Sequence, residues 1–294
     1  NEHFTNVGPT LQSKIPVHEN VNFADFLPPA TDAIMHDFDP VLESSVIDYV
    51  NSIENSKSTF NSIPMKIFKA VLRTISAPLT HIVNVSMTTG TVPSFCKTAR
   101  VTPLLKSGEV EDPNNYRPIS ILPIISKCIE YFVCKQLTDH MENNNLFCSQ
   151  QYGFRKNYST TYLMLKLMDE IYDSKSSNKT PAIIFLDLKK AFDTVNHEIL
   201  LEKLSHYGIS GRALLWFVNY LTDRYQCTKV GGKISTILRI VCGVPQGSLL
   251  GPILFCIYIN DLQNACHMST PFLFADDGAL LFKDIDRKSY MNMQ

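Results

Sequence analysis

The chain has 294 residues, 45% of them hydrophobic, and a formal net charge of −1. This length suits one large or two ordinary hydrophobic cores, and no apolar run reaches the roughly 20 residues of a membrane-spanning helix. We find no internal repeat, no long low-complexity run and no signal peptide, which excludes a secreted protein and predicts an intracellular one, in the nucleus or the cytoplasm. The first residue is Asn rather than Met, so we expect a fragment of a longer protein.

The eight cysteines form no Cys-x-x-Cys pair, and no histidine stands near them at the spacing of zinc ligands. Several of them, such as Cys128 and Cys256, lie within apolar runs. This pattern predicts buried free thiols in a reducing compartment rather than a zinc site.

Charge is unevenly distributed along the chain. Residues 1–56 contain nine acidic residues and only Lys14, whereas residues 57–294 contain 26 Lys and Arg against 19 Asp and Glu. A basic main body suits a nucleic-acid partner without requiring one, since a mildly basic globular domain is the plain alternative.

In chain order, the first segment, residues 1–44, lacks clear periodicity and contains Pro28-Pro29, which predicts an extension or linker. Asp39-Pro40 predicts the start of a helix that ends near Ile53. Further along, the apolar patterns predict a helix over 63–85 interrupted near Pro78, a strand over 99–105, helices over 124–143 and 159–173 and a buried strand over 182–187. They then predict a helix from about 198, a helix over 207–224 with a break over 208–211 near its start, a hairpin over 227–241 and a helix from about 251 to about 262.

Two adjacent aspartates stand out in the segment Thr270–Phe282. Asp276 and Asp277 separate two apolar runs, a pattern that predicts a strand, a tight turn and a second strand. Adjacent carboxylates repel each other, so a turn that lifts them out of two buried strands indicates a divalent cation. For the pair taken alone, a solvated Asp-Asp-Gly hairpin turn is the plain alternative.

Asp187 ends the predicted buried strand over 182–187. A strand-end aspartate is commonly a cap or turn residue. Beside the Asp276 hairpin, it would complete a site for two Mg²⁺ ions about 3.5–4 Å apart, which clamp the attacking and leaving oxygens of a phosphoryl transfer. Carboxylate, water and substrate phosphate oxygens are the ligands that Mg²⁺ prefers.

The segment Gly243–Pro252 lies between these aspartates in the sequence. Its spaced glycines let the backbone approach a flat or phosphorylated ligand closely, and Gln246 offers both a donor and an acceptor. Taken alone, the segment is equally compatible with a Gly/Pro turn that caps the following helix.

The order of these motifs resembles the palm of a reverse transcriptase, and more narrowly that of the non-LTR retrotransposon class (LINE-like, including jockey-type elements). The motifs that carry the resemblance are Pro93–Lys106, Asn115–Leu122 with Lys127 and Glu130, Gln151–Arg155 with Ser159 and Thr160, Phe185–Val195, Gly243–Pro252 and Phe274–Asp277. The resemblance covers roughly residues 45–294. It implies a mixed α/β (α+β) right-hand polymerase with fingers over 45–180 and a palm over 181–294, whose antiparallel strands carry the aspartates, with the thumb absent.

The resemblance also implies a role for each matching residue. Asp187, Asp276 and Asp277 match the catalytic aspartates that bind two Mg²⁺ ions, with Mn²⁺ as a substitute, and Asp187 and Asp276 would bear most of the coordination. The implied reaction is RNA-templated DNA synthesis, in which a primer 3′-OH attacks the α-phosphate of a dNTP. The implied partners are an RNA template and a DNA primer, with no membrane, and an endonuclease domain is expected in the full-length protein.

Further matches concern substrate binding. Lys106 and Arg117 match cations that grip the triphosphate, a task for which the planar guanidinium suits bidentate contact. Phe192 matches the bulky residue beneath the sugar, which would clash with a ribose 2′-OH. Gln246-Gly247 match the loop that packs on the nascent base pair, and Arg155 is assigned to a template contact.

The chain departs from the family pattern at three positions. Phe60 and Asn61 replace a Gly and an Asp near the first motif, changes that would weaken the fingers, and Gly278 stands where Thr or Ser is common. With the thumb absent, we expect poor solubility and weak processivity.

Three alternatives stay open. The first is a catalytically inactive transposon relic that binds RNA. The second is a viral-type RNA-dependent RNA polymerase, which ranks low because such enzymes usually have Gly-Asp-Asp and a small or polar residue in place of Phe192. The third is a maturase-like splicing factor of the same superfamily.

Overall fold

The structure, a computed structural model, describes residues 1–16, 21–55 and 63–283. Its α-helices are α1 (Glu2–Gln12), α2 (Glu43–Ser52), α3 (Met65–Ala70), α4 (Leu72–Thr89), α5 (Ile124–Asn143), α6 (Thr160–Ser176), α7 (His197–His206), α8 (Gly211–Leu221), α9 (Leu250–Tyr258) and α10 (Leu262–Ala265). Its strands are β1 (Thr98–Leu105), β2 (Tyr116–Ile121), β3 (Ala182–Asp187), β4 (Arg224–Val230), β5 (Lys233–Ile234), β6 (Leu238–Ile240), β7 (Thr270–Phe274) and β8 (Asp277–Phe282). Short 3₁₀ turns are η1 (Phe23–Phe26), η2 (Ser94–Lys97), η3 (Pro113–Asn115) and η4 (Ala191–Thr194).

Most of the predicted elements are confirmed, but several boundaries are wrong; the helix predicted from Asp39-Pro40, for example, begins at Glu43. The helix α6 begins where its N-cap residue predicts, because the Ser159 side chain accepts a hydrogen bond from the Tyr162 amide at 3.1 Å. The helix α4 runs through Pro78 without interruption, and the break falls at Val71 instead. The break predicted over Gly208–Gly211 is confirmed, since Gly208 has φ +85° and α8 begins at Gly211. The predicted end of this helix is wrong, because α8 stops at Leu221 and Arg224 begins β4.

The strands form two sheets. The larger has the order β2-β1-β4-β5 with β6 also paired to β4, and the smaller, of three strands, has the order β3-β8-β7. All pairs in the smaller sheet are antiparallel, as predicted for the strands that carry the aspartates. β1 pairs in parallel with β4, so segments on both sides of residue 180 share one sheet; the division into fingers and palm at that residue stays a prediction.

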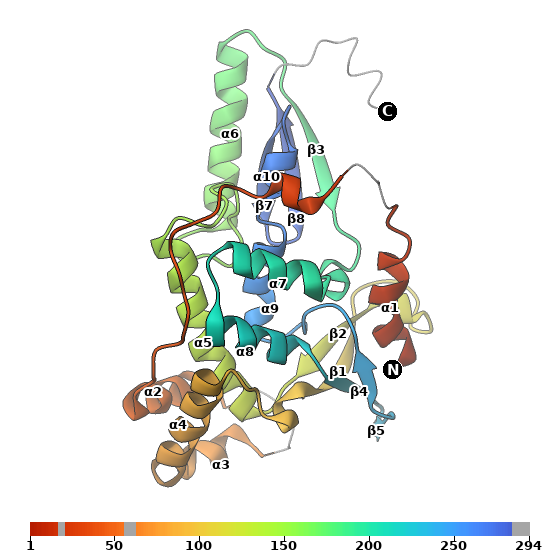
Figure 1. Ribbon diagram of the computed structural model, residues 1–294. Helices are drawn as coiled ribbons and strands as arrows, with labels where there is room; N and C mark the ends of the chain where they lie inside the picture. The colour runs from red at the N-terminus through yellow and green to blue at the C-terminus, as the bar shows by residue number, and fades with distance from the viewer. Residues whose placement is uncertain (17–20, 56–62, 284–294) are drawn as a thin grey trace.

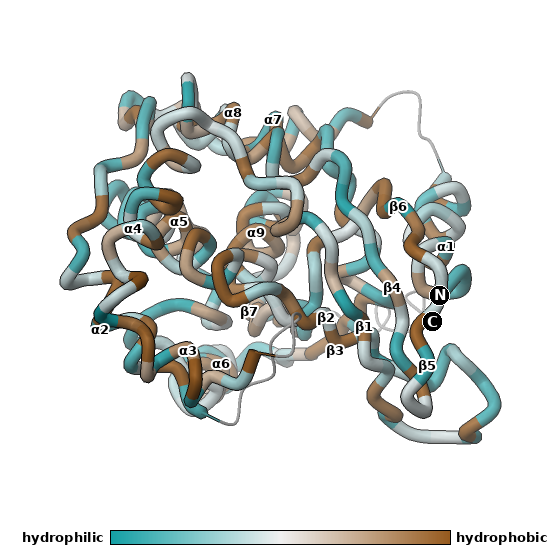
Figure 2. The backbone as a smooth tube through the Cα atoms, turned by 90° about the horizontal axis from the view of Figure 1, so that it is seen from below, coloured by the Kyte–Doolittle hydropathy of each residue, from teal (hydrophilic) through white to brown (hydrophobic). Residues whose placement is uncertain are grey.

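Two separate clusters of buried side chains support these sheets. The large cluster is built from α2–α5 and α7–α9, with Trp216, Phe217 and Phe255 among its fully buried members. Figure 2 shows the hydrophobic α9 running through the interior. The small cluster consists of Tyr152, Leu167, Phe272, Ala279 and Leu281, and joins α6 to the three-stranded sheet. In Figure 1 this sheet and α6 form one end of the molecule, and α2, α3 and α4 lie at the other.

The predicted extension contains a helix that its sequence did not reveal. α1 packs against η4 and β6, and lies to one side of the molecule in Figure 1. Gly8 makes this contact possible, because a Cβ at that position would lie 2.2 Å from the carbonyl oxygen of Asp193. The Gln12 side chain donates to the carbonyl of Thr194 at 2.9 Å. The extension therefore braces the segment that follows Asp187.

All eight cysteines are free thiols, as predicted, and six of them are buried. Across the part of the chain that the structure describes, none of the helices combines the length and the apolar character needed to cross a membrane. The departures at Phe60 and Asn61 lie outside the described residues.

Candidate active site

The two aspartates of the hairpin occupy different positions. Ala275 and Asp276 form the two-residue turn between β7 and β8, and Ala275 has φ +57°, the left-handed conformation that tight hairpin turns require. Asp277 is the first residue of β8 and stands opposite Asp187, the last residue of β3. Directly opposed residues of antiparallel strands have Cβ atoms about 5 Å apart. The structure thus places Asp187 beside the hairpin that carries Asp276 and Asp277.

A cavity of about 350 Å³ opens next to this sheet edge. Its wall includes six of the nine residues singled out from the sequence: Lys106, Arg117, Asp187, Phe192, Gln246 and Asp276. The carboxylates come from the three-stranded sheet, whereas Lys106 follows β1 and Arg117 lies on the paired strand β2. Both cationic side chains are exposed to solvent. We call Asp187 and Asp276 the acidic wall of the cavity and Lys106 and Arg117 its basic wall; Lys189 and Lys190, which follow Asp187 in the chain, also line it.

The carboxylates of the acidic wall are the groups in this cavity that could bind a metal ion. Among the described residues, no group of three or more His, Cys, Asp or Glu side chains is arranged to hold a metal ion. Two carboxylates, those of Asp187 and Asp276, share the cavity wall. Mg²⁺ is commonly held by one or two carboxylates, with water and substrate phosphate oxygens completing the shell. The residues present therefore fit a Mg²⁺ site that the substrate completes.

Phe192 also lines this cavity. Its ring is half-buried and stacks on the ring of Phe255 in the large cluster, with centroids 4.8 Å apart. Its carbonyl accepts a hydrogen bond from the Val244 amide at 2.8 Å. Stacking on Phe255 and the backbone hydrogen bond from Val244 hold Phe192 in place.

The loop Gly243–Ser248 lies close to its neighbours at two glycines. Gly243 has φ +83°, and a Cβ there would lie 2.8 Å from the Asp193 carbonyl oxygen. Gly247 has φ +113°, and a Cβ there would lie 2.7 Å from the Ser120 carbonyl oxygen. The Ser120 amide in turn donates to the carbonyl of Gln246 at 2.7 Å. The glycines predicted to allow close approach to a ligand thus allow close approach to β2 and η4 as well; Gly247 is not among the residues that line the cavity.

Asp193 was not singled out from the sequence. Its carboxylate accepts a hydrogen bond from Gln246 Nε2 at 3.0 Å. Burial raises the pKa of Asp193 to about 6, against the opposing effects of Lys190 and of the Gln246 hydrogen bond. The sequence signal for Asp193 was its place as the second aspartate of the pattern Asp-x4-Phe-Asp, which begins at Asp187.

Lys190 is a second residue that sequence reasoning missed. It lines the cavity between Asp187 and Phe192, and its Nζ donates to the carbonyls of Asn114 and Tyr116 at 3.3 and 3.2 Å. These bonds connect the segment after β3 to η3 and β2. The pair Lys189-Lys190, which follows Asp187 after Leu188, was its signal in the sequence.

Glu130, noted within the fingers motif, is fully buried in α5. Its carboxylate accepts hydrogen bonds from the Leu249 amide at 2.9 Å and from the Tyr220 hydroxyl at 3.1 Å. Burial raises the pKa of Glu130, while Arg224 and these hydrogen bonds oppose the rise. Glu130 therefore anchors the end of the Gly243–Ser248 loop, where α9 begins.

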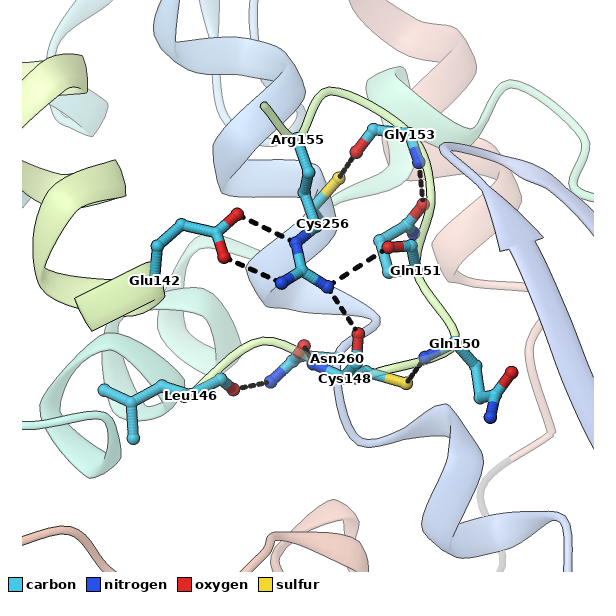
Figure 3. Close-up of polar contacts among 9 residues, drawn as sticks. All are labelled: Glu142, Leu146, Cys148, Gln150, Gln151, Gly153, Arg155, Cys256 and Asn260. Carbon is cyan, nitrogen blue, oxygen red and sulfur yellow. Dashed lines mark hydrogen bonds and ion pairs between the residues drawn. The ribbon is translucent and has the colours of Figure 1, made fainter. Parts of the chain in front are cut away.

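Arg155 is not among the residues that line the cavity. Its guanidinium is held in two hydrogen bonds by the carboxylate of Glu142, at 2.9 and 2.7 Å, and donates to the carbonyls of Cys148 and Gln151 (Figure 3). Only 8% of the side chain is exposed. Its role in this structure is to hold the loop before α6, and the template contact stays a prediction.

An acidic sheet edge that shares a cavity with cationic side chains suits metal-assisted phosphoryl transfer. The family model described as reverse transcriptase (RNA-dependent DNA polymerase) matches residues 104–292. The chain belongs to this family.

Named relatives place the chain among mobile elements. It is 30% identical to a probable RNA-directed DNA polymerase from transposon BS of Drosophila melanogaster, over 83% of this chain and 28% of that protein. It is 28% identical to the RNA-directed DNA polymerase from mobile element jockey of the same species, over 70% of this chain and 23% of that protein. A Pol polyprotein from the type-1 retrotransposable element R2 of Popillia japonica is 30% identical, over 70% and 30% respectively. The chain spans less than a third of the length of these relatives.

Proposed function

We propose that this chain is the polymerase part of a non-LTR retrotransposon protein and catalyses RNA-templated DNA synthesis. In the proposed reaction, a primer 3′-OH attacks the α-phosphate of a dNTP and pyrophosphate leaves. The observation that carries the proposal is the shared cavity, whose lining includes Asp187 and Asp276 together with Lys106 and Arg117. A dNTP needs this combination, because its triphosphate is anionic and its transfer requires charge neutralisation on both sides of the reacting phosphorus.

The carboxylates of Asp187 and Asp276 would hold divalent cations, with Asp277 in support from its position opposite Asp187. Bound Mg²⁺ supplies Lewis-acid stabilisation of the attacking and leaving oxygens. Asp187 ends a strand and Asp276 forms a tight turn, so both side chains are fixed by backbone pairing on a common sheet. This fixed geometry would orient the ligands without a further ordering cost.

On the basic wall, Lys106 and Arg117 would bind the triphosphate. Lys190 follows Asp187 by three residues and donates hydrogen bonds to the carbonyls of Asn114 and Tyr116. These bonds would keep the basic wall close to the acidic wall. Phe192 would lie beneath the sugar and exclude a ribose 2′-OH, because the stacked ring of Phe255 prevents it from moving down. Gln246 and Gly247 would pack against the nascent base pair.

The direct test is primer extension on poly(rA)/oligo(dT) by the 294-residue chain in Mg²⁺ or Mn²⁺. We expect Asp276→Ala to lower incorporation by about 10³-fold, since removing one ligand raises the barrier by several kcal/mol. Asp169→Asn, at an exposed position of α6, is the control and should keep wild-type activity. Near-normal extension by Asp276→Ala would refute the assignment.

A separate substitution tests sugar selection. Phe192→Ala should admit rNTPs, narrowing the preference for dNTP over rNTP while dNTP incorporation continues. An unchanged preference would remove Phe192 from the proposed role.

A catalytically inactive relic that binds RNA is the second candidate. It is favoured by the donor set of the described residues, in which no group of three or more His, Cys, Asp or Glu side chains is arranged to hold a metal ion without a substrate. RNA binding by a wild-type chain that incorporates no dNTP with either metal would support it.

We further propose an RNA template and a DNA primer as partners and, in the full-length protein, an endonuclease domain elsewhere in the chain. We also propose that the protein acts inside the cell, in the nucleus or the cytoplasm. Expression of the parent gene with a tag, followed by fractionation and sequencing of the bound RNA, tests these points together.

A further inference from the structure

Asp193 is an acidic residue near the cavity that has no place in the proposed chemistry. It lies on η4, directly after Phe192, yet it is absent from the lining of the cavity of about 350 Å³. Asp193 instead lines a much smaller void of about 40 Å³, which residues 243–246 of the Gly243–Ser248 loop also line. Gln246 lines both spaces. The side chain of Gln246 therefore connects Asp193 to the substrate cavity.

The backbone on both sides of this contact is fixed. Val244 donates to the carbonyl of Phe192 and Gly243 donates to the carbonyl of Val195, each at 2.8 Å. The carbonyl of Gln246 accepts from Ser120 on β2 at 2.7 Å. With both backbones held, the orientation of the Gln246 amide is set by the group that its terminal nitrogen meets, which is the Asp193 carboxylate at 3.0 Å.

An ionised carboxylate only accepts hydrogen bonds, so it selects the NH₂ end of an amide and rejects the carbonyl end. A neutral carboxyl group can also donate, and would tolerate either end. We propose that Asp193 is a positioning residue, whose ionised carboxylate holds the nitrogen of the Gln246 amide and leaves the amide oxygen as the end offered to the incoming nucleotide. This inference rests on the proposed polymerase function and deepens it.

The surroundings make this orientation sensitive to pH. Burial raises the pKa of Asp193 to about 6, so its charge changes just below neutral pH. The titratable or charged groups of the packed segments are Lys190 at the start of η4, Arg224 of β4, the thiol of Cys242, His197 of α7 and His3 of α1. α1 borders the void with Phe4, Thr5, Gly8 and Pro9, which are uncharged.

The test is single-nucleotide extension by the 294-residue chain, with KM for the dNTP and kcat measured from pH 5.5 to 8.5. At pH 8, Asp193→Asn should raise KM about tenfold, the effect of losing one charge-assisted hydrogen bond, and leave kcat within about twofold. The wild-type KM should rise toward the variant's value below pH 6, while the KM of Asp193→Asn stays flat. Asp48→Asn, an exposed change on α2, should follow the wild-type profile.

A double-mutant comparison separates positioning from a general structural effect. Gln246→Ala and Asp193→Ala should each raise KM, and the double variant should be no worse than Gln246→Ala alone, because both changes remove the same function. Additive effects, or an Asp193→Asn profile identical to the wild type, would overturn the proposal.

A second readout does not need activity. The side-chain amide resonance of Gln246, assigned from its loss in Gln246→Ala, should shift with an inflection near pH 6 that Asp193→Asn abolishes. If the wild type fails to extend a primer but shows this inflection, the polymerase proposal fails while the Asp193–Gln246 coupling stands. A resonance that does not respond to pH in the wild type overturns the coupling.

Discussion

The loop that carries Gln246 and the hairpin that carries Asp276 border the same cavity, but they rest on hydrophobic clusters of very different size. The loop leads directly into α9, whose side chains are buried in the large cluster. The hairpin rests on the small cluster of five buried residues beneath α6. On the same strand as Asp187, Phe185 is 78% exposed. The side of the cavity that carries Gln246 is thus supported by the large cluster, and the side that carries Asp187 and Asp276 by the small one.

This contrast has a thermodynamic consequence. Stability within one protein varies with local burial, and a segment with few buried contacts opens at a lower free energy than the global transition. The hairpin and β3 should therefore open before the large cluster does. Substitutions in the two clusters can show whether this is so.

The largest effect is expected in the large cluster. Trp216 is fully buried, stacks on Tyr220 with centroids 5.1 Å apart, and donates from Nε1 to the Ser86 hydroxyl at 3.0 Å. Trp216→Ala should lower the free energy of unfolding by about 3–5 kcal/mol, because it leaves a large cavity and an unpaired hydroxyl. Urea unfolding followed by circular dichroism measures this. Trp216→Phe, which keeps most of the volume, should cost clearly less, and equal losses would contradict the packing argument.

The next effect tests whether the small cluster opens separately. Leu281 of β8 is fully buried, and Leu281→Ala should cost about 2–4 kcal/mol locally. Because Trp216 is the single tryptophan of the chain, its fluorescence reports the large cluster. We expect faster hydrogen exchange over 270–283 with little change in the fluorescence transition.

The neighbouring Leu280 is half-buried on the opposite face of β8 and gives the matched control. Leu280→Ala should affect exchange in the hairpin much less. If Leu281→Ala shifted the Trp216 fluorescence transition as much as it destabilised the hairpin, the two clusters would form one cooperative unit, and the comparison between them would fail.

Arg155 lies where the two clusters meet, and its substitution should have a smaller effect. Its guanidinium stands 5.1 Å from the ring centroid of Phe147 in the large cluster and 4.3 Å from that of Tyr158 beside the small one. Arg155→Lys keeps the charge but loses the bidentate bond to Glu142, so we expect a loss of about 2 kcal/mol in urea unfolding. Arg212→Lys removes a similar but exposed pair with Asp37 and should change stability by less than about 1 kcal/mol. Equal effects of the two lysines would show that burial of the Arg155 pair is unimportant.

The sequence predicted most of the local elements because these depend on short patterns. The alternation of apolar residues around Asp276 defines the hairpin, and Ser159 defines the start of α6. The clustering of six predicted residues around one cavity follows from the motif order that carries the family resemblance.

What the sequence did not predict depends on contacts between distant segments. α1 has a Gly and a Pro within it and is held by η4 and β6, more than 180 residues away. The internal role of Arg155 depends on Glu142, at the far end of α5. Asp193 was passed over because its partner Gln246 lies 53 residues further along the chain. Tertiary partners, rather than local propensity, decide these cases.

The smallest predicted effect is the pH dependence of stability that the Asp193 carboxyl group contributes. A carboxyl group whose pKa is raised to about 6 in the folded state binds its proton more tightly there than in the unfolded chain. Its contribution therefore favours folding at acidic pH and is lost as pH rises from about 4 through about 6. Between pH 5 and pH 6 this amounts to about 1 kcal/mol, since one pKa unit corresponds to about 1.4 kcal/mol.

His197 acts in the opposite direction, because burial lowers its pKa below the ordinary value of 6.5 and stability then rises with pH toward that value. The quantity to measure is therefore the difference between wild type and Asp193→Asn in urea unfolding at each pH, in which the His197 contribution cancels. The stability advantage of Asp193→Asn over the wild type should grow by about 1 kcal/mol from pH 5 to pH 6. A difference that is constant across this range would mean that the carboxyl group is ionised throughout, and the pH-sensitive part of the positioning role would then be lost while the hydrogen bond to Gln246 remained.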